Sequence, residues 1–184
     1  MDRRPEALPR TYRYRLYPTA QLGFACELYN ATLEQRRDAW LGRRRSLSYV
    51  AQYRELTDSR AHGMGPAGMS CHAMRDPLRR LDRAFAAFFR RAKAGQKPGY
   101  PRFRSRRRYD SLTWDTWRLQ QGRLGLPGIG FLKLRWHRPL PNDAELRTVT
   151  VRRDARHWYV GFALERPKPQ LPALVSRLVL IWGS

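Results

Sequence analysis

The sequence contains little cysteine, few acidic residues and no long apolar run. Two cysteines among 184 residues, Cys26 and Cys71, exclude a disulfide framework and indicate reduced thiols in a cytoplasm. No stretch of about 18 apolar residues is present, which argues against a membrane span. Residues 1–10 are too charged to contain the apolar middle of a secretory signal. We therefore expect a cytoplasmic protein that does not associate with membranes.

The usual markers of catalysis are also missing. The sequence has no phosphate-binding GxxxxGK[ST] loop, no GxSxG elbow, no HExxH pair and no CxxC pair. The strands and turns of the second half carry scattered acids, which could in principle clamp two metal ions, but arginines flank them and favour ion pairs. We therefore predict no catalytic residue, no metal ligand and no cofactor. The acids considered are Asp110, Asp115, Asp143, Glu145 and Asp154.

Arginine, by contrast, is abundant. The chain has 37 basic against 15 acidic residues, a net charge of +22, and only four of its basic residues are lysines. A GC-rich genome would explain the preference for arginine over lysine, but not the surplus over acids. A protein this basic attracts polyanions at any physiological pH, and guanidinium groups bind phosphates in a bidentate manner. The composition therefore predicts a nucleic-acid-binding protein.

The first half of the chain has the periodicity of helices. Apolar residues at helical spacing predict a helix from about Ala20 to Leu41 and a shorter one over 49–56. The clearest amphipathic stripe predicts a long helix that ends near Gly95. This helix begins either at Pro77, capped by the preceding aspartate, or at Ser70 with a kink at the proline.

The second half has the alternating pattern of short strands. The segments 148–152 and 158–164 flank a turn and predict a hairpin, and the alternation over 11–17 predicts an N-terminal strand. An α+β fold with a small barrel or sandwich follows. We divide the chain into an N-terminal arm with the first strand (1–18), a helical recognition lobe (19–95), a basic loop (96–108), the rest of the β part (109–166), and a linker followed by an apolar tail (167–184).

The candidate binding residues are cations on the helices and in the basic loop, where Tyr100 and Phe103 lie between arginines. Guanidinium groups interleaved with aromatic rings suit a phosphate backbone with exposed bases or an A-form duplex. The alternatives are a solvated basic linker for the loop and a β-core role, rather than base stacking, for Trp114, Trp117 and Trp136 together with Trp158. The predicted cations are Arg43, Arg44, Arg45, Arg75, Arg79, Arg83, Arg90, Arg91, Lys97, Arg102, Arg104, Arg106, Arg107 and Arg108.

The order of several short motifs resembles the N-terminal half of the TnpB (OrfB) family, transposon proteins related to type V CRISPR effectors. Each motif is weak alone, but together they cover most of residues 11–164. They are Tyr14-Arg15-Leu16-Tyr17-Pro18 followed by Gln21, Leu28-Tyr29-Asn30, Leu81 with Phe85 and Phe88-Phe89-Arg90, Gly99-Tyr100-Pro101-Arg102-Phe103-Arg104, Gly122-Arg123-Leu124-Gly125-Leu126-Pro127, and Val149-Thr150-Val151-Arg152-Arg153.

The resemblance implies a small oligonucleotide-binding-type β-barrel interrupted by an inserted helical lobe. It also implies binding of a structured guide RNA and of target DNA beside a short sequence motif. In that family, a tyrosine just after the first helix and residues early in the long helix face the DNA. These positions match Tyr49, Cys71, His72 and Arg75 here, although the long-helix residues differ in type from the family's.

The resemblance ends where a RuvC-type nuclease begins in the family. Its first catalytic aspartate follows a proline-rich linker, and residues 173–184 at that place contain no acid. The later catalytic acids and the zinc-ribbon cysteines would lie beyond Ser184. We therefore expect a transposon-encoded chain that is truncated, by a frameshift or an early stop, at the start of its nuclease domain.

Three hypotheses follow. The leading one is a truncated TnpB-like protein that binds guide RNA and DNA without nuclease activity of its own. The second is an active transposase or nuclease, completed by another chain or by acids such as Asp110 and Asp154. The third is a decayed transposon product without function, in which the apolar residues 178–182 have nothing to pair with.

Overall fold

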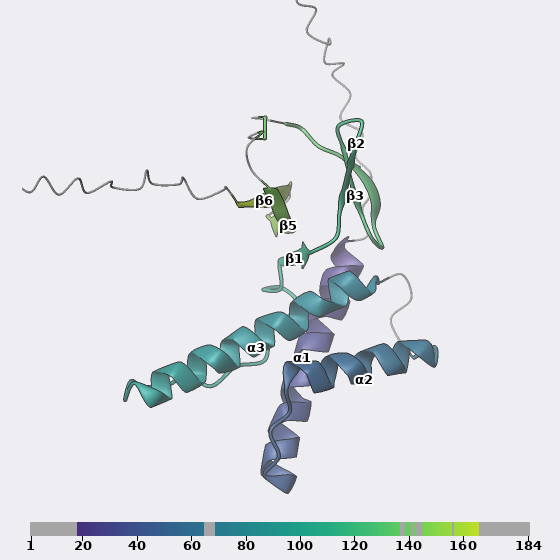
Figure 1. Ribbon diagram of the computed structural model, residues 1–184. Helices are drawn as coiled ribbons and strands as arrows, with labels where there is room; N and C mark the ends of the chain where they lie inside the picture. The colour runs from purple at the N-terminus through teal and green to yellow at the C-terminus, as the bar shows by residue number, and fades with distance from the viewer. Residues whose placement is uncertain are drawn as a thin grey trace, which may run out of the picture.

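The computed structural model describes residues 18–64, 69–136, 139–140, 142, 145–155 and 157–165. The predicted N-terminal strand, the proline-rich linker and the apolar tail lie outside these residues. Helices come first and strands follow (Figure 1). The elements are α1 (Pro18–Arg43), α2 (Tyr49–Ala61), α3 (Cys71–Lys93), β1 (Ser111–Trp114), β2 (Arg118–Gln120), β3 (Arg123–Leu126), β4 (Gly130–Lys133), β5 (Glu145–Asp154) and β6 (His157–Glu165).

The three predicted helices are confirmed. The second is longer than expected, because α2 continues to Ala61. For the long helix, the start at Ser70 is correct: the Ser70 side chain caps α3 by accepting a hydrogen bond from the backbone N–H of Ala73 at 3.2 Å, and Pro77 lies inside the helix. Asp76 is therefore not a cap. Both it and Pro77 are buried against the sheet side of the molecule.

A buried arginine joins the three helices. The Arg36 side chain of α1 is 8% exposed, and its Nε donates to Gln52 of α2 at 2.7 Å. Its second contact is an ion pair with Asp82 of α3 at 3.2 Å, and its guanidinium lies 5.1 Å from the centre of the Phe85 ring. Gln52 in turn donates to the backbone carbonyl of Thr32. These contacts hold the helices in one arrangement, because every polar group of this buried set has a partner whose loss would be costly.

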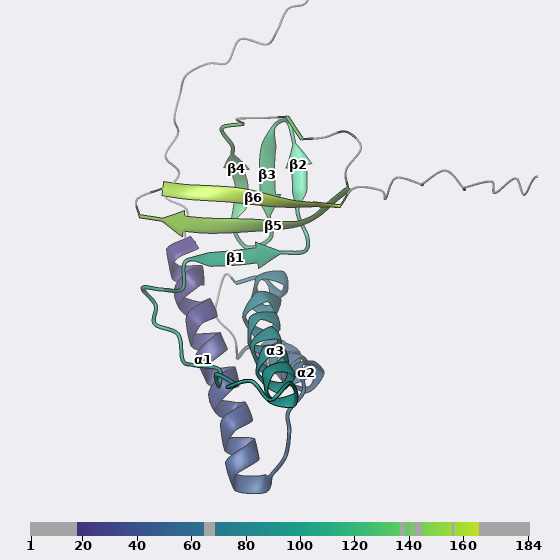
Figure 2. The same ribbon diagram turned by 90° about the vertical axis from the view of Figure 1, so that its left-hand side faces the viewer.

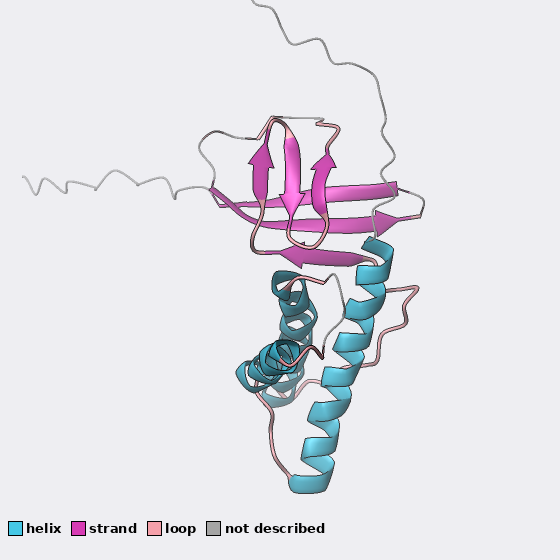
Figure 3. Ribbon diagram, turned by 90° about the vertical axis from the view of Figure 1, so that its right-hand side faces the viewer, coloured by secondary structure: helices cyan, strands magenta, loops and turns pink. Residues whose placement is uncertain are grey.

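The strands form two antiparallel sheets of three strands each. One has the order β1-β5-β6, and its β5–β6 hairpin confirms the predicted hairpin. The other has the order β2-β3-β4. The two sheets cross in front of each other, and the helices lie beyond the β1 edge (Figures 2 and 3). The α+β class is confirmed.

The expected barrel is wrong for the described residues, since neither sheet closes on itself. The strands β2 to β4 have only three or four residues and pair only with one another. Closing a sheet needs its outer strands to pair, and β6 has no described strand on its outer side. The predicted strand over 11–17, which would make the helical lobe an insertion, lies outside the described residues; within them the helices precede the strands.

One apolar core extends from the helices into both sheets. It contains Leu22 and Tyr29 of α1, Met74 of α3, and Trp114 at the end of β1. Trp114 is fully buried, as predicted, whereas Trp136 is 40% exposed and stacks on another ring. No helix in the described part is long and apolar enough to cross a membrane. The core fixes the helices against the sheets and so positions the surface described next.

A buried ion pair lies where α3 meets β1. The Asp76 carboxylate is 3% exposed and lies 2.8 Å from Nε of Arg80, one helical turn later. Burial raises the pKa of Asp76, although the charge of Arg80 and a backbone hydrogen bond from Thr113 oppose that rise. The guanidinium of Arg80 also lies 5.2 Å from the centre of the Tyr109 ring. The buried carboxylate of this junction thus forms an ion pair with Arg80, and removal of that cation would leave a buried charge uncompensated.

Candidate nucleic-acid interface

The basic loop (residues 96–108) leaves the end of α3, passes beside α1 and leads to β1 (Figure 2). The Asn30 side chain of α1 binds both backbone groups of Arg104: it accepts from the N–H at 2.8 Å and donates to the carbonyl at 2.9 Å. Sγ of Cys26 donates to the same carbonyl at 3.2 Å. Pro101 is buried as well. These anchors argue against a plain flexible linker.

Aromatic rings accompany the loop. The Tyr100 ring meets the rings of Phe85 and Phe88 edge to face, with centroids 5.6 and 5.5 Å apart. Phe103 points outward and is 51% exposed. Between the loop and the helices is an open hollow of about 1000 Å³, with buried Tyr29 among its lining residues. The loop therefore presents both charge and flat apolar surface.

The loop cations divide into paired and unpaired groups. Arg106 forms an ion pair with Glu27 of α1, and the guanidinium of Arg104 lies 5.8 Å from the centre of the Tyr29 ring. The remaining predicted cations of the loop are exposed and form no ion pair with any residue that the structure describes. They are Lys97, Arg102, Arg107 and Arg108. These four are free to bind phosphates.

The predicted cations on the helices fall in separate places. On α3, Arg83, Arg90 and Arg91 are exposed and form no ion pair within the described ranges. Arg90 and Arg91 belong to the last turn of α3, from which the basic loop departs. Residues 43–45 instead lie at the end of α1 that is farthest from the sheets (Figure 2). The structure does not bring that triplet together with the loop.

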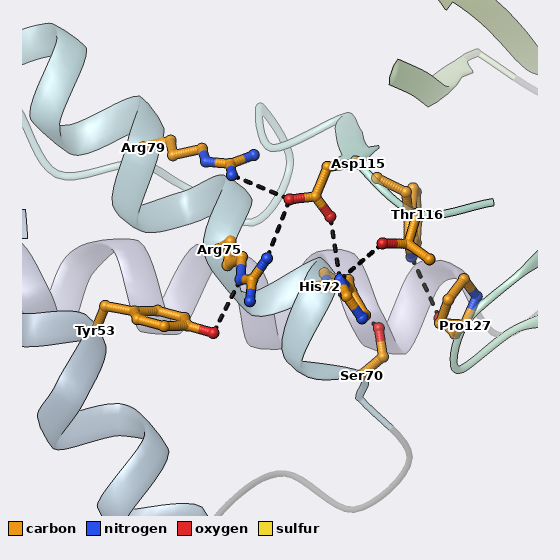
Figure 4. A network of polar contacts seen from close by, with 10 residues as sticks. Tyr53, Ser70, His72, Arg75, Arg79, Asp115, Thr116 and Pro127 are labelled. Atoms are coloured by element: carbon orange, nitrogen blue, oxygen red, sulfur yellow. Dashed lines mark hydrogen bonds and ion pairs between the residues drawn. The ribbon is translucent and has the colours of Figure 1, made fainter. Parts of the chain in front are cut away.

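A second polar site surrounds Asp115, which directly follows β1 (Figure 4). We call Tyr53, His72, Arg75, Arg79, Asp115 and Thr116 the Asp115 cluster. One carboxylate oxygen of Asp115 lies 3.1 Å from Nδ1 of His72. The other lies 3.3 Å from Arg75 and 3.0 Å from Arg79. Nε of Arg75 donates to the hydroxyl of Tyr53 at 2.9 Å. The cluster thus ties α2, α3 and the end of β1 together.

The electrostatics of the cluster stabilise the charged carboxylate. Burial by itself would raise the pKa of Asp115, but the hydrogen bond from His72 and the charge of Arg79 outweigh it and hold the pKa below its ordinary value. The hydrogen bonds that Arg75 donates to Tyr53 and Asp115 raise the pKa of Arg75. The carboxylate therefore serves as a fixed anion that orients two arginines on one face of α3.

The histidine of the cluster does not form a nucleophilic relay. Nδ1 of His72 contacts both Asp115 at 3.1 Å and the hydroxyl of Thr116 at 3.0 Å. In a relay, the acid and the nucleophile contact opposite ring nitrogens. Here they share one nitrogen, so the arrangement positions the imidazole instead of activating the hydroxyl.

Three positions matched by the resemblance meet in or beside this cluster. Tyr49 stacks on Tyr53 with ring centroids 6.0 Å apart, and Tyr53 binds Arg75. His72 and Arg75 then meet at Asp115. The tyrosine pair lies one turn apart on α2 and continues the same surface. Residues far apart in sequence thus form one polar and aromatic face.

The chain is similar to a longer protein. Over 190 aligned residues it is 35% identical to a protein of Streptomyces pristinaespiralis that is named as a candidate RNA-guided DNA endonuclease. The match covers 93% of this chain but 45% of the relative, so the chain spans less than half of that protein's length. No family model matches the sequence. The name of the relative is consistent with the resemblance to the TnpB family.

Sequence reasoning missed the roles of four residues of this surface. Tyr53 was detectable, because it lies one turn after Tyr49 on a predicted helix. Asp115 was expected to pair with arginines, and it does so with Arg75 and Arg79. Its role as the centre of a cluster depends on the contact between α3 and the end of β1, which periodicity does not reveal. The same holds for Thr116 and for the role of Asn30 in anchoring the loop.

We expect Asp115→Asn to lower the free energy of unfolding by about 1–3 kcal/mol at pH 7, because hydrogen bonds to a charged group are lost. A carboxyl group whose pKa is lower in the folded state stabilises the fold at pH values above its unfolded-state pKa of about 4. That stabilisation is lost as the pH falls through the folded-state pKa. The difference between the variant and the wild type should therefore shrink at pH 3. Chemical unfolding at both pH values measures it.

The control for this substitution is Asp154→Asn. Asp154 is exposed at the end of β5 and forms no ion pair with a described residue. It should leave the unfolding curve unchanged at both pH values. Equal stability of Asp115→Asn and wild type at pH 7 would show that the cluster contributes nothing to the fold.

Proposed function

We propose that this chain is the nucleic-acid-binding part of a TnpB-like, RNA-guided DNA endonuclease, and that it binds a structured guide RNA and target DNA. The observation that carries the proposal is the basic loop, whose backbone is locked by Asn30 while several of its cations have no acidic partner in the described part of the chain. The similarity to the Streptomyces protein supports the same function.

The loop suits a phosphate backbone for an electrostatic reason. Arg107 and Arg108 project from an anchored segment, so little conformational entropy is lost when they bind phosphates. Arg90 and Arg91 extend the positive surface at the end of α3. Each phosphate contact releases counterions, so the affinity falls steeply with salt and depends little on sequence.

The Asp115 cluster suits a different kind of contact. The Asp115 carboxylate compensates part of the charge of Arg75 and Arg79, which reduces their general attraction for phosphates. It also holds their donors and the His72 ring in fixed directions. We propose that this face, with Tyr49 beside it, contacts the DNA next to the guide-paired strand, where fixed donors can distinguish base edges.

We also propose that this chain binds without cutting. A two-metal nuclease needs several carboxylates free to hold cations. On the strands and their ends, Asp110 binds Arg152 at 3.1 Å, Asp115 binds two arginines, and Glu145 lies 3.0 Å from Arg147. Asp154 forms no ion pair with a described residue and Asp143 lies outside the described residues, so the pairing of the other three acids is what supports a structural role. The transposon-encoded origin and the domain boundaries predicted from the sequence belong to the same proposal.

Purified protein in mobility-shift titrations tests the proposal. We expect low-salt binding to a structured RNA and to duplex DNA, and one discrete transcript that copurifies from the native cell. No shift with either ligand at low salt would contradict it. A copurifying smear would indicate charge attraction without a guide. Mg²⁺-dependent cleavage that Asp110→Ala or Asp154→Ala abolishes would favour the nuclease instead.

A further inference from the structure

The hollow beside the basic loop has the features of a binding site for a single nucleotide. Its volume of about 1000 Å³ lies at the upper end of the range of small-molecule sites. Its lining includes Tyr100, Phe103, Arg107 and Arg108 but no acidic residue. A ligand that fits this lining has a negative charge and a flat apolar part. A nucleotide combines both.

The two aromatic residues of the loop have different roles. Tyr100 packs against Phe85 and Phe88, so its ring is part of the helical lobe. Phe103 has no ring contact with any described residue and is 51% exposed. The anchor on the adjacent Arg104 fixes the backbone that carries this ring. Phe103 is therefore a preorganised flat surface without a partner.

We infer that Phe103 stacks on an unpaired base of a single-stranded segment, while Arg107 and Arg108 bind the flanking phosphates. In a duplex, neighbouring base pairs cover the faces of each base, so the ring could reach a base face only in a single strand, a bulge or an end. An acidic peptide would satisfy the arginines but would leave the ring unused. The inference rests on the proposed function and specifies one contact within it.

The test uses fluorescence anisotropy of the full chain with labelled oligouridylate and oligothymidylate of about ten nucleotides. We expect Phe103→Ala to weaken binding roughly 5–100-fold, the range for loss of one stacked base. Because stacking releases no counterions, this ratio should be the same at low and high salt. Phe103→Tyr should restore the affinity. Whichever of the two oligonucleotides binds more tightly shows whether RNA or DNA supplies the stacked base.

Tyr159→Ala is the matched control, because that ring is 56% exposed on β6 and is not among the residues that line the hollow. It should bind as the wild type does. The inference would be overturned if Phe103→Ala bound single strands with wild-type affinity. It would also be overturned if Phe103→Ala lost as much affinity for blunt duplex DNA as for single strands. The proposed function would then still stand if the wild type binds RNA and DNA. Absence of any wild-type binding would overturn both.

Discussion

Arg80→Met is expected to lower the free energy of unfolding by about 3–5 kcal/mol at pH 7, the usual cost of removing one partner of a buried ion pair. Asp76 is 3% exposed, and Nε of Arg80 lies 2.8 Å from its carboxylate. Methionine keeps much of the apolar length of arginine and removes its charge. The variant therefore leaves a buried carboxylate without its cation. Urea unfolding followed by circular dichroism measures the loss.

The pH dependence of this loss identifies its cause. Burial raises the folded pKa of Asp76 above the unfolded value, and loss of Arg80 raises it further. A carboxyl group whose pKa is higher in the folded state contributes most to stability at pH values below its unfolded-state pKa. That contribution is lost as the pH rises through its folded-state pKa. The cost of Arg80→Met should therefore shrink at acidic pH, where the carboxyl group is neutral.

Two further variants complete this experiment. The double variant Asp76→Asn/Arg80→Met should recover most of the stability, because no buried charge remains. Arg83→Met is the comparison on the same helix: Arg83 is exposed, has no ion pair in the described part and acts on Asp76 through a more distant charge, so its cost should be much smaller than that of Arg80→Met. A cost of Arg80→Met that is small, or the same at all pH values, would contradict the assignment.

Replacing Arg104, Arg106, Arg107 and Arg108 by alanine is expected to weaken nucleic-acid binding roughly 10²–10³-fold near 0.1 M salt and to reduce the salt slope by about three. Many sequences should be affected alike, because phosphate contacts carry no sequence information. The pairs of Arg106 with Glu27 and of Arg104 with the Tyr29 ring make these values upper bounds. Titrations at several salt concentrations measure the slope.

The control removes the same charge from another part of the surface. Its four arginines are exposed, lie outside the loop and form no ion pair with a described residue. They are Arg37, Arg54, Arg60 and Arg123, each replaced by alanine. If this variant lost as much affinity as the loop variant, total charge and not the loop would explain binding. If the loop variant kept the wild-type affinity, the loop would be a plain linker that does not contribute to binding.

Local patterns predicted the elements well where one periodicity dominates. The stripe through Leu78, Leu81 and Phe85 predicted α3, and the alternation of β5 and β6 predicted their hairpin. The strand β2 was missed because three exposed residues carry no pattern. The barrel that the resemblance implied is not formed by the described strands, because strand pairing between distant segments is decided by tertiary structure and alternation leaves it open.

The sequence by itself determined the charge, the helices and the hairpin, because composition and local periodicity are properties of neighbouring residues. Only the tertiary structure decided which arginines are available. Arg75 and Arg79 have the same side chain as Arg107 and Arg108, yet the contact of α3 with the end of β1 places them beside Asp115. An ion pair depends on a few ångströms between distant segments, and that separation is set when the core folds.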